Sequence, residues 1–233
     1  MKPHKQNHDK GVGAFTMTEL VIVLVCLLVL AGLILPTLND RHHGCRINCS
    51  NNLKQIGLAF LTWGLDNNDK LPMEISVTNG GAMELLNTGT VFPVFAVLSN
   101  ELSTPRILIC PTEDDPKRTA ATTFQNSTPQ GSAPAVPFTN DNNVSYFVGL
   151  DVNQTNPPGL LAGDRNLAIG GVPAAHGLLE LRAGSAVSWL KSMHNQVGNI
   201  ALLDGSVQQL SSTRLSDLLT SFGVGTTNRL AIP

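Results

Sequence analysis

The chain has 233 residues, of which 42% are hydrophobic and only 14% are charged, and its formal net charge is −2. A typical soluble domain carries about 25% charged residues, and a nucleic-acid-binding domain is usually basic. The composition therefore excludes a basic nucleic-acid-binding protein and a strongly acidic disordered chain, and four cysteines are too few for a disulfide-dense miniprotein.

The N-terminal region is the most unevenly composed part of the chain. Residues 1–14 are polar and carry three lysines against one aspartate, whereas Leu20 to Leu35 form an unbroken apolar run. As a helix, the segment 15–38 would be roughly 36 Å long, compared with about 30 Å for the hydrocarbon core of a bilayer. We therefore expect 15–38 to be a transmembrane helix, with the basic segment 1–14 on the cytoplasmic side.

Two other interpretations of this region remain open. A removable secretory signal would be cut after Ala31, and an ordinary single-pass anchor would be retained. The apolar run continues past Ala31, and a secretory signal has no use for the carboxylate of Glu19. Both facts argue against the secretory signal.

The segment Ala14-Phe15-Thr16-Met17-Thr18-Glu19-Leu20 resembles the cleavage and methylation site of type IV prepilins and of type II secretion pseudopilins. In that family a prepilin peptidase removes a short basic leader just before a Phe and methylates the new amine. The resemblance implies a leader over 1–14, with cleavage between Ala14 and Phe15 and N-methylation of Phe15. Most relatives have Gly where this chain has Ala14.

Further positions fit the same family. With Phe15 as the first mature residue, Glu19 is the fifth and Pro36 the twenty-second, a position where many of these helices carry a kinking Pro. Segments that resemble a large prepilin-like subfamily are Cys49–Leu58, Asp66–Pro72, Ile109–Thr112 and the C-terminal H-x9-D-G pattern from His194 to Asp204 and Gly205.

Glu19 has two alternative roles. In the family this carboxylate is thought to pair with the N-terminal amine of a neighbouring subunit, which would neutralise both charges and set the register of assembly. The other role is local, because an anion at a helix N-terminus is stabilised by the helix dipole.

The helix is expected to continue beyond the apolar run, from Thr16 to about Leu65, with Pro36 kinking it. Within 39–65 an apolar stripe recurs at i, i+3, i+7 and i+10, which predicts an amphipathic continuation. The stripe consists of Leu53, Ile56, Phe60 and Trp63.

Residues 66–233 are the size of one domain, and we expect it to be extracytoplasmic. The pattern predicts short helices over 83–86 and 94–98, strands over 106–110 and 143–149, and Gly-, Pro- or Ser-rich loops over 119–143 and 151–177. The Asp204-Gly205 pair between two apolar runs predicts a hairpin, and Ser212 or Thr213 is expected to cap a helix that Gly223 ends. The expected fold is α+β and pilin-like: a long N-terminal helix, transmembrane and then amphipathic, packed on a loop-rich antiparallel sheet.

The candidate chemical sites are few. His194 and Asp204 could form a catalytic or metal pair, but a turn and core role fits them better, and no nucleophile motif accompanies them. Carboxylates beside Asn in loops could bind structural calcium, although no EF-hand pattern is present. These carboxylates are Asp66, Asp69, Asp141, Asp151 and Asp164.

The cysteines do not form a zinc pattern. Cys26 lies in the apolar run, and Cys45 and Cys49 are four residues apart on one helix face. Because Cys49 and Cys110 both fall in family-like segments, the resemblance favours a disulfide between them, with Cys45–Cys110 as the alternative. In the chain-entropy model such a loop of about 60 residues stabilises by roughly 4 kcal/mol.

The resemblance implies a structural, non-enzymatic subunit of a type II secretion or type IV pilus-like filament. We expect no cofactor, with structural calcium as the alternative. Its partners would be prepilin peptidase, copies of itself and other pseudopilins, and an inner-membrane assembly platform, with no nucleic acid. It would cross the inner membrane once, with its C-terminal domain in the periplasm. The alternatives are a membrane-anchored extracytoplasmic binding protein that does not polymerise and a secreted enzyme with a cleaved signal.

Overall fold

The computed structural model describes residues 16–37, 41–125, 135–153, 159–223 and 226–233. The chain divides into two compact units, Met1–Arg41 and His42–Pro233. The first contains helix α1 (Met17–Thr37), and helix α2 (Arg41–Asp66) begins at its border and belongs almost entirely to the second. The single helix expected from Thr16 to Leu65 is thus described as two helices, and residues 38–40 between them lie outside the described residues.

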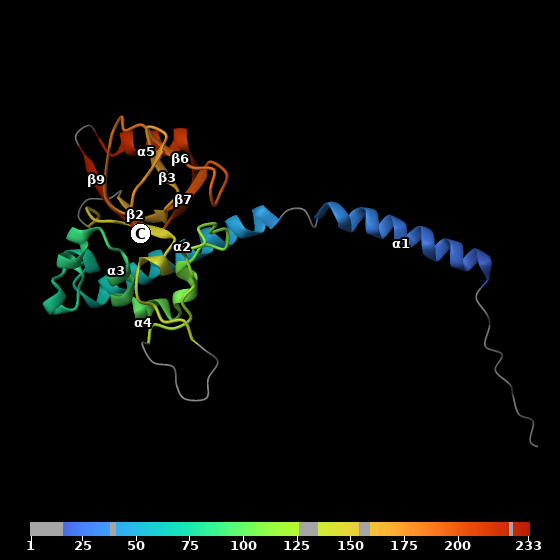
Figure 1. Cartoon of the computed structure of the whole chain (residues 1–233), viewed down its shortest axis with the longest axis horizontal. Coiled ribbons are helices and arrows are strands. Elements are labelled where there is room, and N and C mark those ends of the chain that lie inside the picture. Colours follow the sequence, from blue (N-terminus) through green and yellow to red (C-terminus); the bar gives the residue numbers. More distant parts are fainter. Residues whose placement is uncertain (1–15, 38–40, 126–134, 154–158, 224–225) are drawn as a thin grey trace, which may run out of the picture. The chain divides into compact units, whose positions relative to one another are not determined.

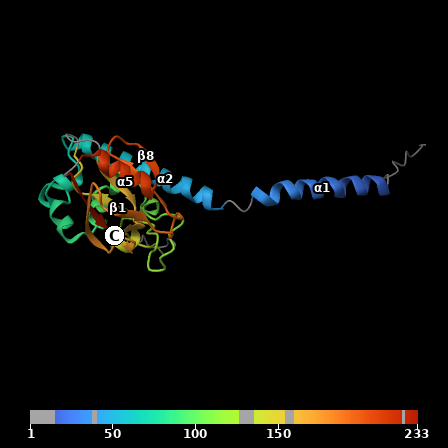
Figure 2. The ribbon, with the colours of Figure 1, turned by 90° about the horizontal axis from the view of Figure 1, so that it is seen from above.

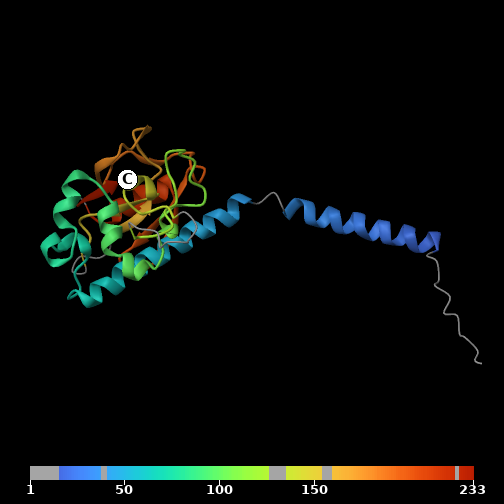
Figure 3. The same cartoon turned by 60° about the horizontal axis from the view of Figure 1, so that its bottom comes forward.

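Helix α2 is followed by a series of short helical turns. They are η1 (Pro72–Glu74), η2 (Val77–Asn79), η3 (Met83–Thr88), α3 (Phe92–Val97), α4 (Ser99–Leu102), η4 (Pro105–Leu108) and, further along the chain, η5 (Asp141–Asn143). The helices expected over 83–86 and 94–98 correspond to η3 and α3. These turns cluster beside α2 (Figure 3).

The strand expected over 106–110 is wrong, because these residues begin in the 3-10 turn η4. Pro105 occupies the first turn, and the Thr104 hydroxyl accepts the N–H of Arg106 at its start. A proline fixes a helical φ, and a capping hydroxyl satisfies the free N–H, so both favour a helical turn over a strand.

The main sheet has six strands in the order β5-β9-β1-β2-β7-β8, and every pairing is antiparallel. Its strands are β1 (Tyr146–Gly149), β2 (Leu160–Asp164), β5 (Gly177–Arg182), β7 (Val197–Leu202), β8 (Val207–Ser211) and β9 (Thr227–Ile232). A second sheet has the order β4-β3-β6, from β3 (Leu167–Ile169), β4 (Val172–Pro173) and β6 (Val187–Trp189). The α+β class with antiparallel sheets is confirmed.

Several sequence boundaries differ from the expected ones. Strand β1 begins at Tyr146, three residues after the expected start, and β2, β3 and β4 lie within 151–177, where the composition indicated a loop. The expected hairpin is confirmed as β7 and β8. Helix α5 (Ser212–Ser221) is also present, but Ser211 caps it, because its hydroxyl accepts the N–H of Arg214.

The main sheet buries side chains on both faces, and α2 and α5 lie on opposite sides of it (Figures 1 and 2). Neighbouring residues of β1 alternate between two cores: Tyr146 and Val148 join the core that contains α2, and Phe147 joins the core that contains α5. This alternation follows from the two-residue period of a strand. The sheet is therefore a central layer, and α2 packs on one of its faces.

Candidate functional site

The start of α1 carries the residues that the family resemblance singles out. Glu19 and Thr16 form a reciprocal pair: the Glu19 carboxylate accepts the Thr16 N–H and hydroxyl, both at 2.8 Å, and the Thr16 hydroxyl accepts the Glu19 N–H at 3.3 Å. This is the capping-box arrangement, which satisfies N–H groups that a helix leaves free at its first turn. Ala14 and Phe15, the expected processing site, lie outside the described residues.

From Leu20 onwards, the described side chains of α1 are apolar on all sides and exposed. Eleven large hydrophobic residues between Met17 and Leu30 are 46% to 79% exposed. Among the residues whose side chains are described, no helix combines the length and the apolarity needed to cross a membrane. Pro36 is the penultimate residue of α1, and the kink expected there stays a prediction.

Helix α2 buries the predicted stripe. Leu53, Ile56 and Phe60 are fully buried and Trp63 is 8% exposed, whereas Lys54 and Gln55 beside them are exposed. The apolar stripe expected from the sequence is therefore the buried face of α2 over residues 53–63.

A disulfide links Cys49 of α2 to Cys110, 61 residues further along the chain, with 5.4 Å between the two Cα atoms. It is the pairing that the resemblance favours, and it leaves Cys110 no thiol for Cys45. Both half-cystines are buried, so the disulfide fastens α2 to the segment after η4 inside the core.

His194 is sealed in the interior next to this disulfide. Its side chain has no solvent exposure, and its Nε2 atom lies 3.3 Å from both Cys110 Sγ and Asp164 Oδ2. Its Nδ1 atom lies 3.3 Å from the Thr112 hydroxyl. A buried imidazole with these neighbours cannot reach a substrate in solution, which fits the core role rather than a catalytic one.

The loop that carries His194 is held in an unusual backbone conformation. Met193, Asn195 and Gln196 have positive φ values of 62°, 54° and 64°, a region that non-glycine residues rarely occupy. The Nδ2 atom of the buried Asn166 lies within hydrogen-bond distance of the carbonyls of Leu190 and Ser192 in this loop and of Val197 at the start of β7. The structure therefore fixes the position of His194 at some conformational cost.

Asp204 and Gly205 form the β7–β8 turn and do not join His194. Asp204 Oδ1 accepts the Ser206 N–H at 2.8 Å, and hydrogen bonding by Ser206 lowers the pKa of Asp204. Gly205 has a φ of 81° and donates to the Leu202 carbonyl. Asp204 keeps a negative φ, so this is a longer turn in which Gly205 alone is left-handed, instead of a two-residue turn.

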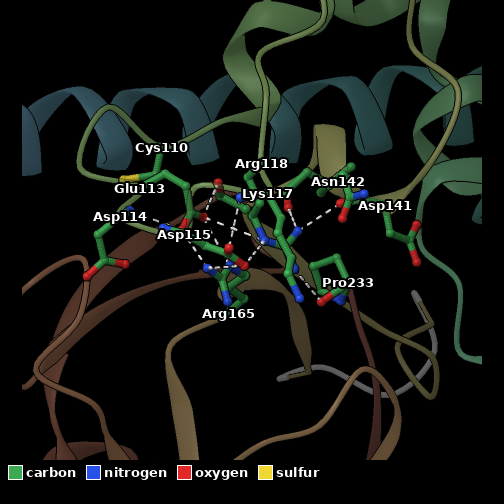
Figure 4. A network of polar contacts seen from close by, with 12 residues as sticks. Cys110, Glu113, Asp114, Asp115, Lys117, Arg118, Asp141, Asn142, Arg165 and Pro233 are labelled. Atoms are coloured by element: carbon green, nitrogen blue, oxygen red, sulfur yellow. Dashed lines mark hydrogen bonds and ion pairs between the residues drawn. The ribbon is translucent and has the colours of Figure 1, made fainter.

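A cluster of charged side chains lies just after Cys110 (Figure 4). Glu113 is almost completely buried between Arg118 and Arg165, and it accepts two hydrogen bonds from Arg165 and one from the Ser145 hydroxyl. Burial alone would raise the pKa of Glu113, but the hydrogen bonds of Arg165 and Ser145, together with the Arg165 charge, hold it below its usual value.

Arg118 extends this cluster towards other parts of the domain. Its guanidinium donates to the backbone carbonyls of Asp141, Val144 and Pro233 (Figure 4). Burial and the neighbouring Arg165 lower the pKa of Arg118, although its carboxylate neighbours oppose this. The cluster connects the segment after the disulfide to the sheet and to the C-terminal residue of the chain.

Three of the five calcium candidates are already engaged by protein groups. Asp141 accepts the N–H groups of Val91 and Phe92 and faces His176 at 2.9 Å. Asp151 pairs with Arg229, and Asp164 accepts two N–H groups of Asn199. Across the described residues, the five candidates do not gather into a shared set of ligands; the group that does gather is Cys49, Cys110 and His194.

The sequence interpretation missed the residues that surround His194. The sequence pattern indicates Asp164 only as a loop carboxylate, and it gives Thr112, Asn166 and Asn199 no role at this site. Their only local signal is that each is a polar residue beside an apolar run, a common pattern. A buried polar residue at a strand end therefore needs the fold to be recognised.

The chain was compared with family models, with curated proteins and with solved structures, and nothing matches it in any of the three.

Proposed function

We propose that the chain is a pilin-like structural subunit, processed by a prepilin peptidase and assembled into a type II secretion or type IV pilus-like filament. The leader would be removed before Phe15, and α1 would anchor the mature 219-residue protein (233 minus 14) in the inner membrane. The domain from α2 onwards would lie on the periplasmic side.

The observation that carries this proposal is the exposed apolar surface of α1. Apolar surface is favoured out of water by about 25 cal/mol per Å², so a helix that is apolar all round needs a surrounding apolar medium. In the sequence the apolar run continues to Leu35, beyond the described side chains. Lipid before assembly and copies of the same helix after assembly would both provide such a medium.

Glu19 supports the same proposal through its position. It lies at the first turn of α1, where Thr16 already supplies two donors to one of its oxygen atoms. A carboxylate oxygen can accept more than one hydrogen bond, so a cation from a neighbouring subunit could join the Thr16 contacts without breaking them. The free amine of Phe15 in a neighbouring subunit would be that cation.

The second unit supports a structural role rather than catalysis. His194 is sealed in the core, and Asp204 is occupied by its own turn. The secreted-enzyme alternative depends on these two residues. In the described structure each has its own set of neighbours, and the two side chains do not form a pair.

The first experiment is to determine the N-terminus of the mature protein in native membranes by mass spectrometry. A start at Phe15 with one added methyl group is expected. A start near Gly32 would mean ordinary secretion, and an intact Met1 would mean an anchor that is not processed; either result would overturn the proposal.

The second experiment measures filament incorporation of Glu19→Ala against the matched control Glu180→Ala. Glu180 is an exposed carboxylate in β5 that pairs with Arg182 on the surface. We expect Glu19→Ala to reduce incorporation strongly and Glu180→Ala to leave it unchanged. Normal incorporation of Glu19→Ala would leave Glu19 with the capping role alone.

A further inference from the structure

Three residues from distant parts of the chain place potential metal ligands at one buried point. Cys49 comes from α2, Cys110 from the segment after η4 and His194 from the loop before β7, and one ligand atom of each lies within 4.8 Å of the other two. All three residues are at most 1% exposed. Their spacing in the sequence follows no metal-binding motif, so only the fold reveals the group.

The imidazole of His194 is oriented as in a metal-binding histidine. Its Nδ1 atom is held by the Thr112 hydroxyl, and its Nε2 atom points at Cys110 Sγ and at Asp164 Oδ2, each at 3.3 Å. In metal sites the nitrogen that does not bind the metal is usually fixed by such a hydrogen bond.

A second, independent observation that points to a cation comes from Asp164. Its side chain is fully buried, and Asn199 holds its Oδ2 atom through two N–H groups at 2.6 and 2.8 Å. Its Oδ1 atom has no hydrogen-bond partner among the described residues. Burying an unsatisfied carboxylate oxygen costs free energy, and a bound cation beside it would remove that cost.

The oxidation state of the cysteines decides which donors are present. In the disulfide the sulfur atoms are neutral and poor ligands, whereas two thiolates and an imidazole are three protein ligands that zinc binds, leaving a fourth position of its tetrahedron. We propose that reduction of the Cys49–Cys110 disulfide converts this cluster into a zinc site, with Cys49, Cys110 and His194 as its protein ligands and the Asp164 carboxylate beside them.

The chemical steps balance with a dithiol as the reductant. The dithiol gives two electrons and two protons to the disulfide and becomes a disulfide itself, while Cys49 and Cys110 become thiols. Zinc then binds both sulfur atoms, and their two protons pass to solvent. The ion would join the same segments that the disulfide joins.

The test uses the full chain in detergent with Cys26→Ser and Cys45→Ser, so that no other thiol is present. The protein is reduced with a phosphine, which takes up the oxygen of one water molecule while the sulfur atoms take its two protons, and is then titrated with Co²⁺ as the probe. We expect one equivalent to bind, with near-ultraviolet thiolate absorption and the intense visible bands of tetrahedral cobalt, and Zn²⁺ to abolish both signals. The oxidised protein should show neither.

Matched variants assign the ligands. His194→Gln should lose the tetrahedral spectrum, whereas the control His176→Gln, an exposed histidine, should keep it. Thr112→Val should weaken binding about tenfold, the usual effect of removing a group that orients a ligand.

Folding is monitored by circular dichroism in the same samples. Reduced protein should gain about 5 °C or more in melting temperature with excess zinc, because zinc binds the folded state. Absence of one-to-one cobalt binding would overturn the proposal. So would a reduced chain that stays unfolded with zinc, or a His194→Gln variant with an unchanged spectrum.

Discussion

Helices α1 and α2 are of similar length, 21 and 26 residues, and differ in what surrounds them. The described side chains of α1 are exposed, while α2 buries one stripe and exposes the residues beside it. A stripe is needed only where one side of a helix meets water and the other meets protein. The lack of a stripe in α1 therefore indicates a surrounding that is the same on all sides.

The largest expected difference between the two helices comes from truncating an apolar side chain. Phe60 of α2 is fully buried and packs edge-on against Phe95, with ring centroids 6.3 Å apart. Phe60→Ala should lower the free energy of unfolding by about 3 to 5 kcal/mol, because it removes buried surface and leaves a cavity. Urea unfolding can be followed by the emission of Trp63 and Trp189, which are both buried in the second unit.

The control for Phe60→Ala is Leu28→Ala in α1, where the side chain is 72% exposed. It should leave the urea midpoint of tryptophan emission unchanged. A comparable loss of stability in both variants would show that α1 contributes to the core of the second unit, and the contrast between the helices would be wrong.

The next largest effect is expected from a charge placed in α1. Val25 lies in the middle of the apolar run, and Val25→Lys should disfavour membrane insertion by about 2.5 to 3.5 kcal/mol, the insertion cost of a charged residue near the centre of a membrane helix. The loss of membrane insertion is measured as the decrease in the fraction of protein that stays in the membrane pellet after carbonate extraction.

Leu58 of α2 is the matched control for Val25, since it is also exposed, at 63%, and lies off the buried stripe. Leu58→Lys should leave both membrane association and stability unchanged, because a surface substitution of this kind rarely matters. Equal membrane association of Val25→Lys and wild type would argue against lipid around α1.

The hydrogen bonds and ion pairs of Glu113 should contribute less to the free energy of unfolding than the buried apolar face of α2. Its pKa is lowered in the folded protein from an ordinary value of 4.5. Its stabilisation is therefore fully present above pH 4.5 and is lost as the pH falls through the folded-state pKa. Glu113→Gln should destabilise by about 2 kcal/mol at pH 7, and the difference from wild type should shrink in thermal melts below pH 4.5.

Glu180→Gln is the control for Glu113, because the Glu180–Arg182 pair is largely exposed. Exposed ion pairs contribute little to stability, so no measurable change is expected. If the Glu113→Gln difference persisted undiminished in acid, ionisation of Glu113 would not be the source of the stabilisation.

The parts of the fold that the sequence predicts well are those with local patterns. The stripe of α2 follows from its helical period, and the β7–β8 hairpin follows from Asp204-Gly205. The run 106–110 shows the limit, since a short apolar segment fits a strand or a buried helical turn equally well, and the capping by Thr104 decided it.

The surroundings of His194 could not be predicted for a different reason. Asp164 and Cys110 lie 30 and 84 residues before His194 in the chain, and no periodicity links the three. Their proximity depends on the packing of β2, the loop before β7 and the disulfide against one another. The H-x9-D-G pattern pointed to His194 but gave Asp204 as its partner, whereas Asp164 occupies that place.

The smallest effects are expected from two glycines that contact α2 or lie in it. Gly205 has a φ of 81°, and a Cβ there would meet Leu61 at an ordinary distance of 3.5 Å, so Gly205→Ala should cost only the backbone strain of about 1 to 2 kcal/mol.

Gly57 lies within α2, and a Cβ there would come only within 4.0 Å of Ala201. Gly57→Ala should therefore stabilise by about 0.5 to 1 kcal/mol, because glycine is a poor helix former. A lower urea midpoint for Gly205→Ala would show that the hairpin turn requires its left-handed glycine. A higher midpoint for Gly57→Ala would show that the buried face of α2 has room for a methyl group, whereas a lower one would mean that the contact between α2 and β7 is already tightly packed.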